Sequence, residues 1–259
     1  MKALAILNIA AYVGTLVINA LANALPINGM TTGDLSALYP NKFVPAGFTF
    51  SIWGIIYLWL GVFVVYQAVV AFSAAPPPGN FVSRVGPWFL ISSLFNVSWI
   101  VAWHYQQVPL SLLIMLGILI SLIMIYQRLP VGLATASGTE KFLVFAPFSI
   151  YLGWITVATI ANVTTLLVDI GWGGLGISDV SWTVTVMVVA ILIGLTMAFQ
   201  RSDIFFPLVG VWALFGIYAK RSAVDPEPLT AILYTAIGGM TILGLGILVQ
   251  VIRGKVYAG

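Results

Sequence analysis

Aromatic and amide side chains at helical spacing are the residues of this sequence whose types could support binding chemistry. Between Ala146 and Asn162 the chain reads A-P-F-S-I-Y-L-G-W-I-T-V-A-T-I-A-N. On a helix, residues three and four apart share a face, so Tyr151, Trp154, Ala158 and Asn162 are predicted to lie together. Aromatic faces offer stacking area for a flat apolar molecule, and the small residue leaves room beside them. The alternative is ordinary packing between membrane helices, with interhelical hydrogen bonds.

Two earlier stretches carry the same kinds of residue. Phe48, Trp53 and Tyr57 stand near the start of one apolar run, and Trp53 and Tyr57 are four residues apart. In the next run, Asn96 and Trp99 are three residues apart. Each pair is therefore predicted to share a helix face. Together with the first stretch, they predict the wall of a cavity between helices.

These aromatic and amide residues could contact either a ligand or each other. A buried amide in lipid needs hydrogen-bond partners, commonly on a neighbouring helix. Asn96 and Asn162 are therefore predicted to tie their two helices together, and this structural role is favoured over ligand contact. Trp88, Trp172 and Trp182 lie near predicted membrane interfaces, where an aromatic belt is expected.

Charged and metal-binding residues are scarce. No Asp, Glu, Lys or Arg lies in the middle of a predicted span, whereas ion pathways and charged-substrate sites usually contain such residues. This argues against an ion-coupled pump and against a retinal protein. The chain has no cysteine and a single histidine, His104, which is predicted to be a solvated helix cap and not a metal ligand. We therefore predict no metal site and no catalytic group.

The composition predicts an all-α polytopic membrane protein. The 259 residues are 61% hydrophobic and 7% charged, whereas soluble domains are about 25% charged. A span needs roughly 20 apolar residues, which predicts about eight transmembrane helices. They are expected near 3–24, 47–73, 85–104, 108–127, 141–168, 181–200, 203–219 and 229–252. The seventh is short and contains Pro207, so it is the weakest of the set. The net charge of +3 reflects residues that flank spans and does not indicate nucleic acid.

The distribution of lysine and arginine predicts the orientation. With the N-terminus inside, seven of these residues fall on the cytoplasmic side and three on the outer side, which favours cytoplasmic N- and C-termini. The longest outer segment, 25–46, is rich in Pro, Gly, Thr and Asn. It is expected to fold over a cavity mouth.

Three stretches, in order, resemble the TspO/MBR family of tryptophan-rich sensory proteins, which includes the mitochondrial translocator protein. Pro45–Tyr57 ends in S-I-W-G-I-I-Y and is similar to the family's P-V-W-x-x-L-Y. Leu94–Trp99, L-F-N-V-S-W, is similar to L-N-x-x-W. Tyr151–Asn162 is similar to the family's P-Y-L-x-W-x-x-x-A-x-x-L-N. The resemblance covers about residues 1–168 and implies a five-helix bundle there, followed by an extension of about three transmembrane helices over residues 169–259.

The resemblance also implies a ligand. The family binds porphyrins, other tetrapyrroles of the haem pathway, sterols and synthetic aromatic molecules. By motif position, Trp53 and Trp154 would line the pocket, Ala158 would occupy the small position that controls sterol fit, and Asn96 and Trp99 would complete the wall. After Asn162 no Tyr is followed by Lys or Arg, so the cholesterol-associated pattern is missing.

The favoured function is a membrane binding protein, not an enzyme, for a flat hydrophobic ligand such as a porphyrin, with a sensory or regulatory role. A transporter of such a molecule is the alternative. A porphyrin-degrading enzyme ranks last, because no acid, base or metal set supports it. The expected partners are membrane lipids and the ligand. A homo-oligomer and a subunit of a larger membrane complex both stay open.

Overall fold

The protein is a bundle of long helices. The computed structural model describes residues 1–25, 27–74, 81–133, 136–223 and 229–257. Eight long helices lie within these ranges: α1 (Lys2–Ala24), α3 (Ile52–Phe72), α5 (Trp88–His104), α6 (Val108–Arg128), α8 (Ala146–Asp169), α9 (Asp179–Gln200), α10 (Phe205–Ser222) and α11 (Thr230–Ile252). All eight correspond to the predicted spans.

Short elements connect the long helices. They are η1 (Ile27–Gly29), α2 (Thr32–Ala37), η2 (Gly47–Ser51), α4 (Phe81–Val85), α7 (Gly138–Glu140), the π-helical η3 (Lys141–Phe145) and η4 (Gly174–Gly176). α2 begins with a capping box, in which Thr31 and Asp34 each bond the other's backbone N–H. Gly86, at φ +55°, separates α4 from α5, because this left-handed conformation suits glycine and ends a helix. The third span therefore begins at Trp88 and not at residue 85.

The fold class of a polytopic helical membrane protein is confirmed. Within the described ranges, six helices are long and apolar enough to cross a membrane, and α5 and α10 fall outside that set. α5 has 17 residues, and α10 has 18 and ends in Lys220 and Arg221. A full count of eight crossings stays a prediction.

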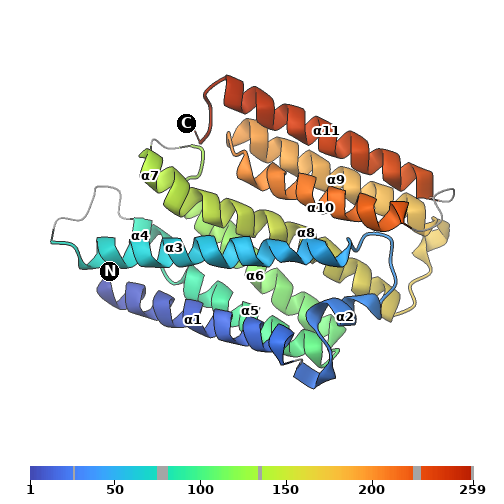
Figure 1. Ribbon diagram of the computed structural model, residues 1–259, viewed down its shortest axis with the longest axis horizontal. Helices are drawn as coiled ribbons and strands as arrows, with labels where there is room; N and C mark the ends of the chain where they lie inside the picture. The colour runs from blue at the N-terminus through green and yellow to red at the C-terminus, as the bar shows by residue number, and fades with distance from the viewer. Residues whose placement is uncertain (26, 75–80, 134–135, 224–228, 258–259) are drawn as a thin grey trace.

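α8 is the central helix. Among the candidate spans, its most hydrophobic window is the most buried, at 78%. On one side α3 and α6 pack against α8, and α1 and α5 pack on those two helices; on the other side α9, α10 and α11 form a group, with α10 packed against α8 (Figure 1). Gly153 allows this approach, because a Cβ there would lie 3.2 Å from the carbonyl oxygen of Phe206.

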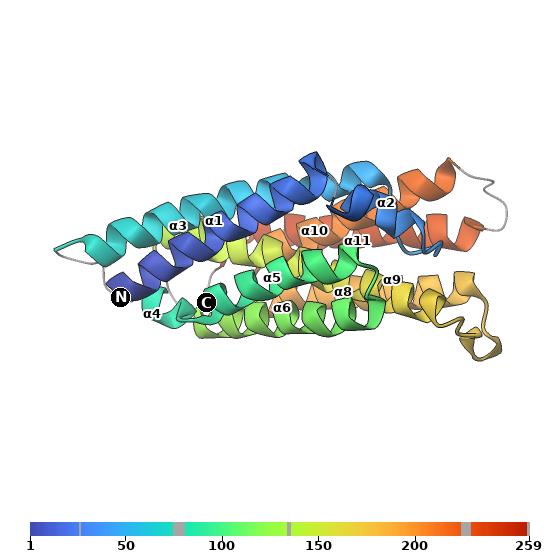
Figure 2. The same ribbon diagram turned by 90° about the horizontal axis from the view of Figure 1, so that it is seen from below.

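The long helices run along one common direction (Figure 2). The two ends of the bundle differ. Both chain termini lie at one end, which we call the terminal end (Figures 1 and 2). α2 and the α8–α9 connection lie at the opposite end, which we call the α2 end. Termini on the same side agree with the predicted arrangement, and the assignment of the terminal end to the cytoplasm stays a prediction.

Candidate functional site

A small cavity lies at the α2 end between α3, α5 and α8. Its volume is about 50 Å³, and a single water needs about 10–15 Å³ on the same measure. Residues Thr32, Ser36, Val44 and Pro45 of the connection between α1 and α3 also line it. The 25–46 segment therefore folds over this cavity, as predicted. Drug-sized ligands occupy about 300–1,000 Å³, so a flat ligand of that size requires the aromatic side chains to move apart.

Five of the nine predicted binding residues line the cavity: Trp53, Trp99, Trp154, Ala158 and Asn162. They come from three helices that are distant in sequence. These three tryptophans form the aromatic wall together with Phe50 and with Trp103, which stacks on Trp99, and Ala158 lies beside them. The sequence spacing thus brings together the residues that the motifs singled out.

Perpendicular ring contacts fill much of the cavity wall. The Trp53 and Trp154 rings lie 6.2 Å apart at 88°, and Phe50 meets Trp154 at 6.0 Å and 90°. The Trp154 side chain is 2% exposed, and its Nε1–H has no acceptor among the described residues. A buried donor without a partner costs free energy of about 1–3 kcal/mol. An acceptor on a bound ligand would remove that cost.

A polar network lies next to the cavity, toward the middle of the bundle. Asn19 of α1 donates to Oδ1 of Asn96 at 2.8 Å, and Nδ2 of Asn96 donates to the Tyr151 hydroxyl at 3.2 Å. Tyr57 stacks on Trp53 at 5.4 Å and 17°, and its hydroxyl has no partner among the described residues. Tyr57, Asn96 and Tyr151 therefore support the aromatic wall from behind and do not line the cavity. The involvement of Asn19 was not anticipated; an asparagine inside an apolar run was its only sequence signal.

Asn162 joins three helices. Its Oδ1 accepts hydrogen bonds from Nε1 of Trp99 on α5 at 3.3 Å and from Oγ of Ser111 on α6 at 3.2 Å. With the bond between Asn96 and Tyr151, two pairs connect α5 to α8. The predicted role of the two asparagines in tying these helices together is confirmed.

Phe48 lies away from the cavity. Its ring is 5.7 Å from the rings of Trp212 and Phe215 on α10, and 46% of the residue is exposed. The physical reason is local: residues 47–51 form the tight helix η2, which directs Phe50 to the cavity and Phe48 to α10. Phe50 and Trp103 are aromatic residues of the cavity wall that the predicted set lacks.

The prediction that His104 is a solvated cap is wrong. The residue is fully buried, and its Nδ1 lies 2.7 Å from the carbonyl oxygen of Ile100. The turn after α5 is covered by the 25–46 segment, from which Asn28 donates to the His104 carbonyl at 3.0 Å. In the part of the chain that the structure describes, no group of three or more His, Asp or Glu could hold a metal ion.

A buried carboxylate at the terminal end was not anticipated. Asp203 is fully buried in the turn between α9 and α10. Its Oδ1 accepts from the backbone N–H of Phe205 at 2.9 Å and Phe206 at 3.1 Å, and its Oδ2 accepts from the Tyr126 hydroxyl at 2.9 Å. Burial raises the pKa of this carboxyl above its ordinary value, although the hydrogen bonds lower it. An aspartate just before an apolar helix is a typical N-cap, and that signal could have identified it.

The segment after α11 closes over this carboxylate. Tyr257 is 1% exposed, and its hydroxyl donates to Oγ of Ser149 at 2.7 Å. Its ring stacks on Phe205 at 5.8 Å, and its backbone N–H donates to the Ser202 carbonyl at 2.8 Å. α8, α10 and the C-terminal segment are thereby joined at the terminal end.

An open apolar groove of about 590 Å³ lies between α3 and α10. Ser51 and Ile52 line it, and the preceding residue, Phe50, lines the cavity. Consecutive residues at the end of η2, Phe50 and Ser51, therefore separate the cavity from the groove. Trp59 and Phe205, whose rings are 5.5 Å apart, also line the groove.

Comparison with known protein families finds one match. The family model described as TSPO-like protein matches residues 5–249. The match extends beyond residue 168, the limit of the motif resemblance, and includes α9, α10 and most of α11. No curated protein and no solved structure matches the chain.

Proposed function

Because the chain belongs to the TSPO-like protein family, we propose that this integral membrane protein binds a flat hydrophobic ligand, of the porphyrin or tetrapyrrole class, in the cavity between α3, α5 and α8. The proposed role is sensory or regulatory: the protein holds the ligand and does not transform it. One observation carries the proposal. Tryptophans from three helices line one cavity, and one of them, Trp154, has a buried donor without an acceptor.

The chemistry of the wall suits such a ligand. Tryptophan rings stack on flat apolar molecules, and each aromatic contact contributes about 0.5–1.5 kcal/mol beyond the burial of area. The Nε1–H of Trp154 is the donor available to an oxygen at the ligand's polar edge, and Trp53, Trp99 and Trp103 supply the remaining aromatic surface. Ala158 leaves the volume that a larger residue would fill. The closed cavity opens by separation of its rings, and the covering segment Thr32–Pro45, like Phe50 of η2, is a part of the wall that belongs to no long helix.

Porphyrin titration tests the proposal. The full chain, purified in detergent, is titrated with protoporphyrin IX, and binding is measured from the porphyrin absorbance so that loss of tryptophan emission does not interfere. Replacing both Trp53 and Trp154 by Phe is expected to weaken binding about tenfold or more. Trp88→Phe is the matched control, because Trp88 begins α5 about 16 Å along the helix from Trp99.

The outcomes are distinct. An unchanged affinity in the double variant would overturn the proposed site. A loss of equal size in Trp88→Phe would show that the substitution acts through general stability and not through the cavity. Conversion of the porphyrin to a product by the native chain would replace the binding function with an enzymatic one.

Transport of the same molecule is a second candidate, and the groove between α3 and α10 favours it. This groove offers a route from the surrounding lipid to within one residue of the cavity wall, at Phe50 and Ser51. Uptake of protoporphyrin IX into proteoliposomes separates the two functions. Accumulation inside the vesicles supports transport, and saturable binding without accumulation supports the binding role alone.

A further inference from the structure

A second hollow lies at the α2 end, between the C-terminal half of α8 and the start of α9. Its volume is about 340 Å³, and residues of the 40–43 segment and of the α8–α9 loop form its mouth. An apolar groove of about 290 Å³ continues from it between α8 and α9. The two hollows share Thr164, Leu167, Trp172, Trp182 and Thr183 as walls. They form one cleft with a polar mouth and an apolar floor, which we call the α8–α9 cleft.

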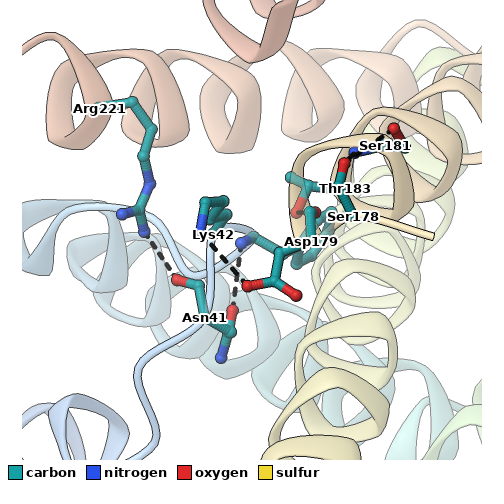
Figure 3. Close-up of polar contacts among 8 residues, drawn as sticks. Asn41, Lys42, Ser178, Asp179, Ser181, Thr183 and Arg221 are labelled. Atoms are coloured by element: carbon teal, nitrogen blue, oxygen red, sulfur yellow. Dashed lines mark hydrogen bonds and ion pairs between the residues drawn. The ribbon is translucent and has the colours of Figure 1, made fainter. Parts of the chain in front are cut away.

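The mouth contains one cation and one anion. Nζ of Lys42 lies 3.4 Å from Oδ2 of Asp179, and the two side chains are 31% and 84% exposed. Figure 3 shows them pointing toward each other, Lys42 from the loop before α3 and Asp179 from the start of α9. An exposed ion pair contributes only about 0–1 kcal/mol. Each charge can therefore exchange its partner for an incoming group of opposite sign at little cost.

The loop that carries Lys42 is held in place. Oδ1 of Asn41 accepts from the backbone N–H of Phe43 at 3.1 Å and of Val44 at 3.0 Å. Arg221 of α10 donates to the carbonyl oxygen of Asn41 at 2.9 Å (Figure 3). It also donates to the carbonyl oxygen of Val44 at 3.2 Å. The arginine thus anchors the turn, and Lys42 presents its ammonium group from a preorganised backbone, which lowers the entropy cost of binding.

Two tryptophans stand beside the ion pair. The Trp172 and Trp182 rings lie 5.3 Å apart at 56° and both line the hollow, so the two tilted rings form an aromatic corner in its wall. Nε1 of Trp182 donates to the carbonyl oxygen of Gly174 at 2.9 Å, which fixes this ring. Asp179 precedes Trp182 by three residues and lies on the same side of α9. Aromatic faces with a nearby carboxylate are the groups that recognise a quaternary ammonium ion.

We propose that the α8–α9 cleft binds a zwitterionic phospholipid with a quaternary ammonium headgroup. The phosphate pairs with Lys42, and the ammonium group lies in the corner of Trp172 and Trp182 beside Asp179. One hydrocarbon chain occupies the apolar groove, whose α8 wall from Ile160 to Leu167 is about 10 Å long. An anionic lipid lacks a cationic group to pair with Asp179 and brings further negative charge close to it. The mouth of the cleft therefore favours a zwitterionic headgroup over an anionic one.

This site is separate from the proposed porphyrin cavity. α8 contributes to both, but with different residues: Ala158, Asn162 and Thr165 line the cavity, whereas Ile160, Val163 and Leu167 line the groove. Binding of a lipid in the α8–α9 cleft therefore does not require binding of a porphyrin in the cavity.

Competition binding tests the lipid proposal. The full chain in detergent is immobilised and equilibrated with a radiolabelled short-chain phosphatidylcholine. The competitors are unlabelled phosphatidylcholine and phosphatidylglycerol of the same chain length, and free glycerophosphocholine. We expect phosphatidylcholine to compete about tenfold better than phosphatidylglycerol, and glycerophosphocholine to compete weakly because it lacks the chain.

Three variants locate the site. Asp179→Asn is expected to reduce the preference for phosphatidylcholine over phosphatidylglycerol several-fold, and Trp172→Leu to weaken phosphatidylcholine about tenfold. Asp169→Asn is the matched control, because Asp169 ends α8 at the same end of the bundle without lining the cleft, and it is expected to leave the preference unchanged.

Four results would overturn the proposal. Equal competition by the two lipids in the native chain would show no headgroup recognition. Equal effects of Asp179→Asn and Asp169→Asn would place the selectivity in the general surface charge. Phosphatidylcholine binding that Trp172→Leu leaves unchanged would remove the aromatic corner from the site. Glycerophosphocholine as strong as the lipid would assign the mouth to a soluble zwitterion.

Discussion

Nε1 of Trp99 on α5 donates to Oδ1 of Asn162 on α8 over 3.3 Å, and this bond holds two walls of the cavity together. The same oxygen accepts from Ser111 of α6, so one amide serves two neighbouring helices. Such side-chain bonds fix the relative position of helices that hydrophobic packing alone would allow to slide in lipid.

The first prediction concerns this amide. Asn162→Leu keeps the size of the side chain and leaves the Nε1–H of Trp99 without its acceptor, whereas the Ser111 hydroxyl keeps the Val108 carbonyl as its acceptor. We expect a loss of about 1–2 kcal/mol in the free energy of unfolding, measured as a lower apparent melting temperature in detergent. Thr156→Val is the control, because among the described residues the Thr156 hydroxyl bonds only the Leu152 carbonyl of its own helix. Equal stability of the two variants would contradict a linking role for Asn162.

The second prediction concerns the contact between α10 and the start of α3. A Cβ at Gly216 would collide with the Thr49 side chain and would lie 2.9 Å from Cβ of Pro45. The backbone N–H of Ala46 also donates to the Gly216 carbonyl at 3.0 Å. Gly216→Ala is therefore expected to destabilise the protein by about 1–3 kcal/mol, as overpacking does.

A matched glycine on α11 provides the control for Gly216→Ala. A Cβ at Gly238 meets nothing within 4 Å, so Gly238→Ala is expected to be neutral or to stabilise α11 by up to about 1 kcal/mol through helix propensity. Both variants are compared by thermal denaturation in the same detergent. Similar behaviour of the two would show that the close approach of α10 to the Pro45–Thr49 segment does not matter for stability.

The third prediction concerns pH. Burial raises the pKa of Asp203 in the folded state above its ordinary value of 3.8. The folded state then binds a proton more readily than the unfolded state, so the contribution of this group to stability is full below about pH 4 and is lost as the pH rises through the raised pKa. We expect Asp203→Asn to remove this part of the pH dependence, while its side-chain oxygen still accepts from Phe205 and Phe206.

Melting temperatures of the native chain and of Asp203→Asn, measured from pH 4 to pH 8, test this expectation. The melting temperature of Asp203→Asn, relative to that of the native chain, should increase as the pH rises. A decrease of this relative melting temperature with rising pH would mean that the hydrogen bonds stabilise the charged form of the carboxylate. Asp203→Ala, which also removes the acceptor of the Phe205 and Phe206 backbone N–H groups at the start of α10, should cost about 1–2 kcal/mol.

Helix positions were predictable from the sequence because runs of apolar residues of span length have few alternatives in a membrane. The cavity wall was predictable in part, because steps of three and four place Trp154, Ala158 and Asn162 on one face whatever the neighbours are. The position of Phe48 was not, since the tight helix η2 turns it toward α10, which lies more than 150 residues later in the chain.

The wrong prediction for His104 and the unanticipated burial of Asp203 share one physical cause. His104 and Asp203 stand at helix ends, where a sequence suggests contact with water. Burial there depends on distant segments that fold over the ends: the connection after α1 covers His104, and Tyr257 and α6 cover Asp203. Local spacing carries no information on such contacts. An aspartate shortly before an apolar helix does, however, indicate hydrogen bonds to the first backbone N–H groups of that helix.

The buried position of Tyr257 has a practical consequence for handling the protein. The C-terminal segment is a packed part of the molecule, since the Tyr257 ring occupies the space between Phe145 and Phe205. An affinity handle or fluorescent fusion attached a few residues after Tyr257 would disturb the packing of this buried side chain and its hydrogen bond to Ser149. Purification handles therefore belong before α1, whose first residues are exposed, and a C-terminal fusion requires a long flexible spacer.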